Sequence, residues 1–157
     1  MSFTGTGQIN IRAKIDSAHG LVTPEADMTR KISSAFASDN TYFTADTDIT
    51  TPGNAYDLSG SLEDDLGDTV IFKEIHLLHF KNDSTVASAN NMIIGSATTH
   101  IPIFKNSAHA MTIKPQSSFT LMDDTGIPVT AGTADTLNIW GANGQAYELV
   151  IIGRRVG

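Results

Sequence analysis

Acidic side chains alternate along one short stretch of the sequence, ADTDITTPGNAYD, which ends at Asp57. Asp46, Asp48 and Asp57 carry carboxylates, the ligands that calcium prefers in proteins. An EF-hand loop needs glycine at its sixth position, which is Thr51 here, and glutamate at its twelfth, which is Asp57. Alternating aspartates on the solvent side of a strand explain the pattern better. We therefore predict that the protein has no metal site. If it had one, Asp46, Asp48 and Asp57 would be the candidate ligands.

The other reactive side chains lack the spacing that catalysis requires. The sequence has no cysteine, no G-x-S-x-G elbow and no phosphate-binding G-x-x-x-x-G-K-[ST] loop. His76 and His79 lie three residues apart in a predicted strand, where they point to opposite faces. No carboxylate pair lies in the apolar context that suits acid–base catalysis. We predict a protein that is not an enzyme and uses no cofactor.

Two further pairs of residues could contact a partner. Trp140 and Tyr147 flank a predicted turn; flat aromatic rings can stack on a sugar, although a cross-strand aromatic pair is the commoner role. Arg154 and Arg155 form a basic pair beside an acidic body. They could bridge to a neighbouring copy or lie in solvent.

Composition excludes several classes of protein. The net charge is −7 with only 10 Lys and Arg residues, which disfavours nucleic acid because phosphate binding needs a basic face. The longest apolar run, Leu149–Ile152, is too short for a membrane span, and the first ten residues do not resemble a secretory signal. The length of 157 residues suits one domain. We expect neither a nucleic-acid nor a membrane partner.

Turn residues divide the chain into short segments with strand character. Gln8–Ile15 and Thr41–Thr50 alternate apolar and polar residues, whereas Thr69–Phe80 has large apolar residues on both parities, which predicts a central strand covered on both faces. Thr23–Phe36 fits a helix and a strand equally. Further strands are predicted at Asn91–Ile94, Ile101–Phe104, Met111–Ile113, Phe119–Met122, Leu137–Trp140 and Tyr147–Ile152.

Two local patterns predict more specific structures. Ser61 with Asp64 forms a capping box, and together with Gly67 it predicts one short helical turn over Leu62–Leu66. The turn at 141–144 predicts a closing hairpin, in which residues 147, 149 and 151 lie opposite residues 137 and 139. The whole chain, residues 1–157, is then a single all-β domain, an antiparallel β-sandwich, preceded by a polar N-terminal arm at residues 1–7.

Two segments carry a resemblance to a known family. Tyr56–Asn82 contains a D-L-[AS]-G-x-L-x-D turn and a long apolar strand that ends in Lys-Asn. Ile113–Gly153 contains a Lys-Pro turn, V-T-A-G-T-x-D-x-L and a closing Y-x-[LV]-V-I-I-G. This pattern resembles small virion structural proteins of tailed bacteriophages. The chain has Gln116 where that pattern usually has glycine, and Thr23–Phe36 matches it poorly.

The resemblance implies a jelly-roll-like sandwich and a structural role. Proteins of this kind are similar to capsid decoration, or cement, proteins, which bind the head exterior. The resemblance also implies a strand within residues 23–36. The expected partners are the major capsid protein and other copies of the chain, as a dimer or trimer. The expected location is the virion, after synthesis in the host bacterial cytoplasm. The interface candidates are Ser2, Phe3, Thr4, Trp140, Tyr147, Arg154 and Arg155.

Two other functions stay open from the sequence. A phage tail or receptor-binding module could hold a host glycan on exposed aromatic side chains. A glycan-cleaving module would need a cleft with paired carboxylates, which the sequence does not locate.

Overall fold

The structure is a computed structural model, which describes residues 6–9, 32–35, 40–50, 53–60, 62–63, 67, 69–85, 90–95 and 97–156. Regular structure in this part of the chain is formed by β-strands, and it includes no helix of the length and apolarity that crossing a membrane requires. The strands are β1 (Thr6–Ile9), β2 (Ile32–Ala35), β3 (Asn40–Asp48), β4 (Asn54–Asp57), β5 (Leu62–Glu63), β6 (Thr69–Val70), β7 (Phe72–Asn82), β8 (Met92–Gly95), β9 (Ala110–Ile113), β10 (Ser118–Pro128), β11 (Thr136–Trp140) and β12 (Ala146–Arg155).

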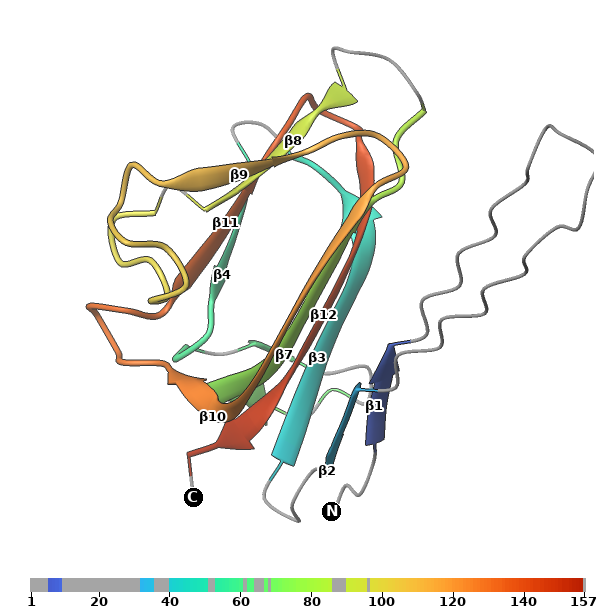
Figure 1. Cartoon of the computed structure of the whole chain (residues 1–157). Coiled ribbons are helices and arrows are strands. Elements are labelled where there is room, and N and C mark those ends of the chain that lie inside the picture. Colours follow the sequence, from blue (N-terminus) through green and yellow to red (C-terminus); the bar gives the residue numbers. More distant parts are fainter. Residues whose placement is uncertain are drawn as a thin grey trace, which may run out of the picture.

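Eight of these strands form two antiparallel four-stranded sheets that pack against each other (Figure 1). One sheet has the order β10-β7-β12-β3, and the other has the order β4-β11-β8-β9. In chain order, the first of the eight pairs with the last (β3 with β12), the second with the seventh (β4 with β11), the third with the sixth (β7 with β10) and the fourth with the fifth (β8 with β9). This nested pairing is a jelly-roll topology. The predicted antiparallel β-sandwich is confirmed.

The core lies between the two sheets and takes side chains from both. Large apolar residues in it are removed completely from solvent, which is the main source of stability for a domain of this size. The largest fully buried side chains are Tyr147, Phe72, Phe80, Ile49, Leu58, Ile75, Leu78, Met92, Ile94, Ile101, Leu137 and Ile139.

Two small ribbons accompany the sandwich, β1 with β2 and β5 with β6. Ile32–Ala35 is therefore a strand, as the resemblance implied, while 23–31 and 36 lie outside the described residues. The helical turn predicted over Leu62–Leu66 is wrong at its start, because Leu62 and Glu63 pair with Val70 and Thr69. Leu62 packs against the core from this ribbon, so tertiary burial overrides the local capping pattern.

Strand β7 is central, as predicted, but it is covered fully on one face only. Its register against β12 shifts at two points, which inserts His76 and Lys73 as extra residues. Each insertion is a β-bulge that reverses the alternation of side chains. Residues of both parities consequently reach the same core, and these are Phe72, Ile75, Leu78 and Phe80. The bulges therefore explain why Ile75 is buried together with even-numbered residues, whereas Ile71 is exposed and Leu77 is only half-buried.

The other predicted strands compare as follows. Strands β3, β8, β9, β10, β11 and β12 lie where the sequence predicted them, with bounds that differ by a few residues. Ile101–Phe104 is a turn instead, in which Phe104 N donates to Ile101 O at 3.3 Å. Pro102 explains the difference, because proline favours the second position of a turn and cannot donate to a strand ladder.

The predicted closing hairpin does not form. Strands β11 and β12 belong to different sheets, so the turn at 141–144 carries the chain across the sandwich. This turn is held at the end of β3, where Ile49 N donates to Gln145 O at 2.8 Å and Gly144 N donates to Ile49 O at 2.9 Å. A hairpin and a connection between sheets use the same turn residues, so local sequence does not distinguish them.

The bulges in β7 predict different effects for two isoleucines of equal parity. Ile75 is completely buried, whereas Ile71 is 37% exposed. We expect Ile75→Ala to lower the free energy of unfolding by about 2–5 kcal/mol and Ile71→Ala by no more than about 1 kcal/mol. Urea melts of both variants measure the difference. Equal losses would show that the alternation of side chains does not reverse between residues 71 and 75.

Gln116 occupies a left-handed position, with φ of 58°, in the turn that leads into β10. Ser117 N donates to Lys114 O at 3.1 Å, and Pro115 takes the second position of this turn. The Gln116 side chain offsets part of the backbone strain, since Nε2 donates to Asp83 O and Ser84 O, each at 2.9 Å.

A pair of substitutions separates these two contributions. Gln116→Gly and Gln116→Ala both lose the side-chain hydrogen bonds, but only alanine keeps the cost of a left-handed backbone. We expect the alanine variant to be less stable than the glycine variant by about 1 kcal/mol in thermal and urea melts. Identical stabilities would contradict a left-handed conformation at this position.

Candidate functional site

One corner of the sandwich joins two of the sequence motifs on which the family resemblance rests. Ser59, from the D-L-S-G turn, donates through Oγ to Asp135 Oδ2 at 3.0 Å, and Leu58 N donates to Asp135 O at 2.8 Å. The Asp135 carboxylate also accepts hydrogen bonds from Gly132 N and, at 3.1 Å, from Thr136 Oγ1. A buried aspartate thereby holds the two motifs together.

The electrostatics of Asp135 follow from this arrangement. Its residue surface is only 5% exposed, and burial alone raises the pKa of a carboxyl group. Hydrogen bonds from Gly132 N and from the Thr99, Ser59 and Thr136 side chains stabilise the charged form more strongly. The net result is a pKa below the ordinary value for aspartate.

A second corner joins the Lys-Asn end of β7 to the Lys-Pro turn. Asn82 N donates to Ser117 O at 3.0 Å, and Gln116 N donates to Asn82 O at 2.8 Å. The Asn82 side chain is completely buried, and its Nδ2 donates to Asn90 O at 2.9 Å and to Ile113 O at 3.0 Å. These two corners show that the motif residues hold turns and sheets in place.

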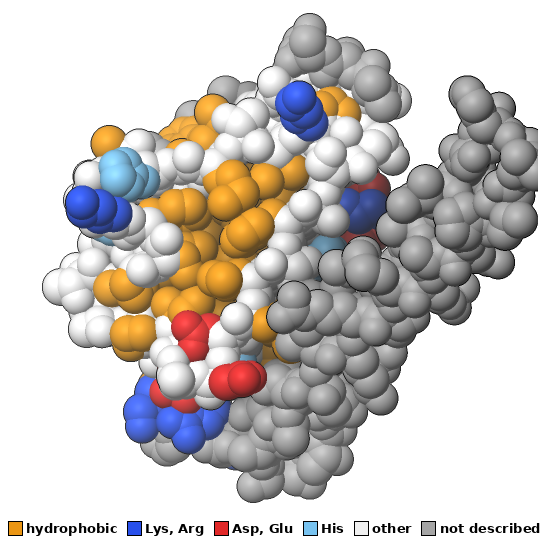
Figure 2. Space-filling view, in the orientation of Figure 1, with side chains coloured by type: hydrophobic (Ala, Val, Ile, Leu, Met, Phe, Trp, Pro, Cys, Tyr) orange, Lys and Arg blue, Asp and Glu red, His pale blue; other side chains and the backbone are white. Residues whose placement is uncertain are grey.

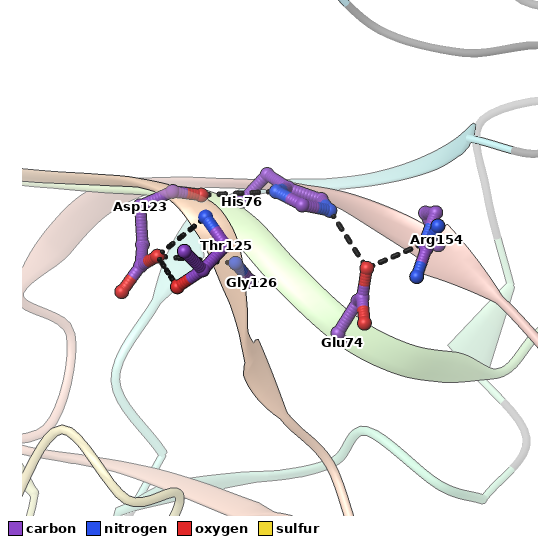
Figure 3. Close-up of polar contacts among 6 residues, drawn as sticks. All are labelled: Glu74, His76, Asp123, Thr125, Gly126 and Arg154. Atoms are coloured by element: carbon purple, nitrogen blue, oxygen red, sulfur yellow. Dashed lines mark hydrogen bonds and ion pairs between the residues drawn. The ribbon is translucent and has the colours of Figure 1, made fainter.

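A group of ionisable side chains lies at the bulges of β7 (Figure 3). Glu74 Oε1 forms an ion pair with Arg154 Nε, and His76 Nε2 lies 3.0 Å from the same oxygen. His76 Nδ1 lies 2.9 Å from Asp123 O, in the bulge of β10. The carboxylate of Asp123 accepts from Thr125 N at 2.8 Å and from Thr125 Oγ1 at 2.6 Å.

The carboxylates of this group are both held in the charged form. Burial raises the pKa of Glu74, but hydrogen bonds from Arg154 and His76 lower it further than burial raises it. Hydrogen bonds from Thr125 hold the pKa of Asp123 below its usual value. The Thr125 hydroxyl already donates to Asp123, and His76 faces Glu74 and a backbone carbonyl, so no base of this group faces a nucleophile. The geometry is that of a clamp across two bulged strands.

Tyr147 does not occupy the position predicted for it. It is completely buried, and its hydroxyl accepts a hydrogen bond from Asn54 Nδ2 at 2.6 Å and also bonds to the Tyr56 hydroxyl. Its ring lies tilted against Phe80, with the ring centroids 5.6 Å apart. Burial, followed by the bond to Tyr147, raises the pKa of Tyr56 above its ordinary value. Tyr147 therefore presents no ring face to solvent on which a sugar could stack, and its side chain belongs to the core.

Trp140 lies on the other sheet, where it pairs with Ile93 on β8. The predicted cross-strand pair of Trp140 with Tyr147 is consequently wrong, because the two residues belong to strands of different sheets. Its indole ring is half-buried, and a Cβ placed on Gly53 would lie only 2.8 Å from it.

The remaining interface candidates have different outcomes. Arg154 forms its ion pair with Glu74 of the same chain, while Arg155 is exposed at the end of β12. Ser2, Phe3 and Thr4 lie outside the described residues. The predicted arm at 1–7 ends earlier than expected, since Thr6 and Gly7 pair with Ala35 and Ser34 in the β1–β2 ribbon.

The three metal candidates are divided between the two sheets. Asp46 and Asp48 are exposed on β3, and Asp57 is exposed at the end of β4, where it accepts from Ser59 N at 3.1 Å. Across the part of the chain that the structure describes, no three acidic or histidine side chains come close enough together to hold a metal ion.

An apolar opening lies between the edge strands β9 and β10, and the sequence did not predict it. Three residues of these edge strands have completely buried partners on the neighbouring strand. Met111 pairs with Ile94, Phe119 pairs with Phe80, and Leu121 pairs with Leu78. Cross-strand partners share one face of a sheet, so these side chains point inward. Met111 is nevertheless 38% exposed, and Phe119 and Leu121 are only half-buried.

Ile103 and Phe104, in the loop before β9, are also half-buried against the core. Figure 2 shows hydrophobic side chains gathered between β9 and β10. The three inward-facing residues Met111, Phe119 and Leu121 are called the apolar opening below. Sequence alternation shows that such residues point inward, but it does not show whether anything covers them.

The sequence and the structure were also compared with known proteins. No family model, no curated protein and no solved structure matches this chain.

The pKa of Asp135 predicts how stability depends on pH. Because the folded pKa lies below the unfolded value of about 3.9, the carboxylate stabilises the fold above that pH, and this contribution is lost as pH falls through the folded pKa. We expect Asp135→Asn to cost about 1–3 kcal/mol at pH 7 and less at pH 3, in urea melts. Asp46→Asn, at an exposed position, is the control. A cost that is the same at both pH values would show that the charge of Asp135 is unimportant.

Proposed function

We propose that this protein is a non-enzymatic structural protein of a bacteriophage virion, a decoration (cement) protein that binds the exterior of the head and stabilises the shell. One observation carries the proposal. The motifs by which the chain resembles such proteins lie far apart in the sequence, yet Ser59 contacts Asp135, and the backbone of Asn82 bonds to the turn that begins with Lys114 and Pro115. A chance likeness of separate segments gives no reason for their motif residues to touch, whereas a shared fold does.

The architecture supports the same proposal. Jelly rolls occur in viral capsid proteins, and also in lectins and cupins, so the fold alone does not determine function. A decoration protein needs a rigid domain with an acidic surface that does not bind the packaged genome, and the net charge of −7 suits this. In this proposal the partners are the major capsid protein and further copies of the chain, and the protein is made in the host cytoplasm. Many weak contacts on one lattice add through avidity.

The glycan-binding alternative loses its main support. Its aromatic platform required Trp140 and Tyr147 on one exposed surface, but Tyr147 is completely buried and the two lie on different sheets. A tail location is therefore kept as an outcome of the test rather than as a second proposal.

The proposal predicts where the protein is found in purified virions. We expect antibody labelling and electron microscopy to place many copies on the head. We also expect particles made without this protein to release DNA at a lower temperature than particles that contain it. Adding the purified protein to such particles should restore their thermal stability. Labelling confined to the tail tip, or particles equally stable without the protein, would contradict a cement function.

A further inference from the structure

We propose that the apolar opening is the surface through which two copies of this chain associate, about a two-fold axis. The inference rests on the self-association that is part of the proposed function, but not on the location of the protein in a virion. It names a surface that the sequence did not predict, in place of the predicted N-terminal arm and aromatic pair.

The first argument is the incomplete burial of inward-facing side chains. Phe119 and Leu121 face the core beside completely buried partners, yet both remain half-exposed at the edge of their sheet. Met111 does the same from the edge of the other sheet. Among the described strands, β9 pairs only with β8 and β10 pairs only with β7, so no described strand closes this side. Contiguous apolar surface of this kind is typical of an interaction site.

The second argument is the distribution of charge along the opening. Lys114 is exposed at one end, in the turn that joins β9 to β10, and Asp124 is exposed toward the other end, in the bulge that follows Leu121. With a rise of about 3.3 Å per residue, β10 separates these two charges too widely for them to pair within one chain.

A two-fold axis through the middle of the opening satisfies both arguments. It covers the apolar side chains of one copy with those of the other, and it brings Lys114 of each copy near Asp124 of its partner. The two ion pairs oppose the repulsion between two chains that each carry a net charge of −7. A small apolar ligand or an unrelated protein would give no reason for a positive charge at one end of the opening and a negative charge at the other. A second copy is therefore the occupant that fits.

Two exposed apolar residues on paired strands provide a matched test. Met111 is 38% exposed and Ile93 is 40% exposed, but Met111 lies opposite Ile94 on the inner face, and Ile93 lies opposite Thr112 on the outer face. In sedimentation velocity on the full-length protein, we expect Met111→Glu to raise the dimer dissociation constant by at least about tenfold. Ile93→Glu should leave it unchanged. Circular dichroism and thermal melts establish that both variants are folded.

Charge reversal tests the two-fold arrangement itself. Lys114→Glu and Asp124→Lys should each weaken association severalfold, and the double variant should restore it, because both intermolecular pairs are then re-formed with opposite sign. The loss caused by either single variant should shrink as salt concentration rises.

Each remaining outcome contradicts a separate part of the inference. A wild-type protein that stays monomeric at the highest soluble concentration would overturn self-association, whatever its location in a virion. Dimers that persist with Met111→Glu would place the contact on another surface. A double charge variant no better than the single variants would exclude the two-fold pairing of Lys114 with Asp124. Virion labelling is measured independently, so failure of the cement function would be recognised separately.

Discussion

The buried amide of Asn82 links the two sheets of the sandwich. This residue ends β7 in one sheet, and its Nδ2 reaches the carbonyl of Ile113 at the end of β9 and that of Asn90, just before β8, in the other. Its Oδ1 accepts from Ser84 N at 3.0 Å, so donor and acceptor are both satisfied without water. An aliphatic side chain of similar size would remove the donor to the buried Ile113 carbonyl, and an unsatisfied buried acceptor costs more than the net gain from a hydrogen bond. The amide thus ties the end of β7 to the end of β9 in the other sheet.

The bulges of β7 impose a second constraint. They illustrate which features of the fold could be predicted from the sequence and which could not. Most strands could be predicted, because alternation and turn residues are local. The covering of β7 was mispredicted because a bulge depends on the partner strand: at Gly153 a Cβ would lie 2.0 Å from Glu74 O, a contact that involves residues far apart in sequence. The supposed hairpin of β11 and β12 failed for the same reason, since membership of a sheet is a tertiary property.

The predicted site residues illustrate this limit at the level of single side chains. Tyr147 alternates like any strand residue, and its complete burial and its hydroxyl bonds to Asn54 and Tyr56, more than 90 positions earlier, become visible only in the structure. Asp135, by contrast, was part of a recognised motif, but its role as a buried acceptor for Ser59 and Gly132 needed the second motif in place. Motifs made of turn residues therefore identify contacts that build a fold, and they do not by themselves identify a function.

The distribution of these constraints also explains how the domain can leave one side open. Side-chain bonds hold strands together at three places, which are the corner at Asp135, the corner at Asn82 and the clamp of Glu74 with Arg154. Stability at the corners does not depend on closing the gap between β9 and β10. Met111 and Leu121 are consequently available to a partner while the rest of the core stays packed. A domain that presents core residues on a rigid frame loses little conformational entropy when it associates, and such preorganisation would favour the proposed association of two copies.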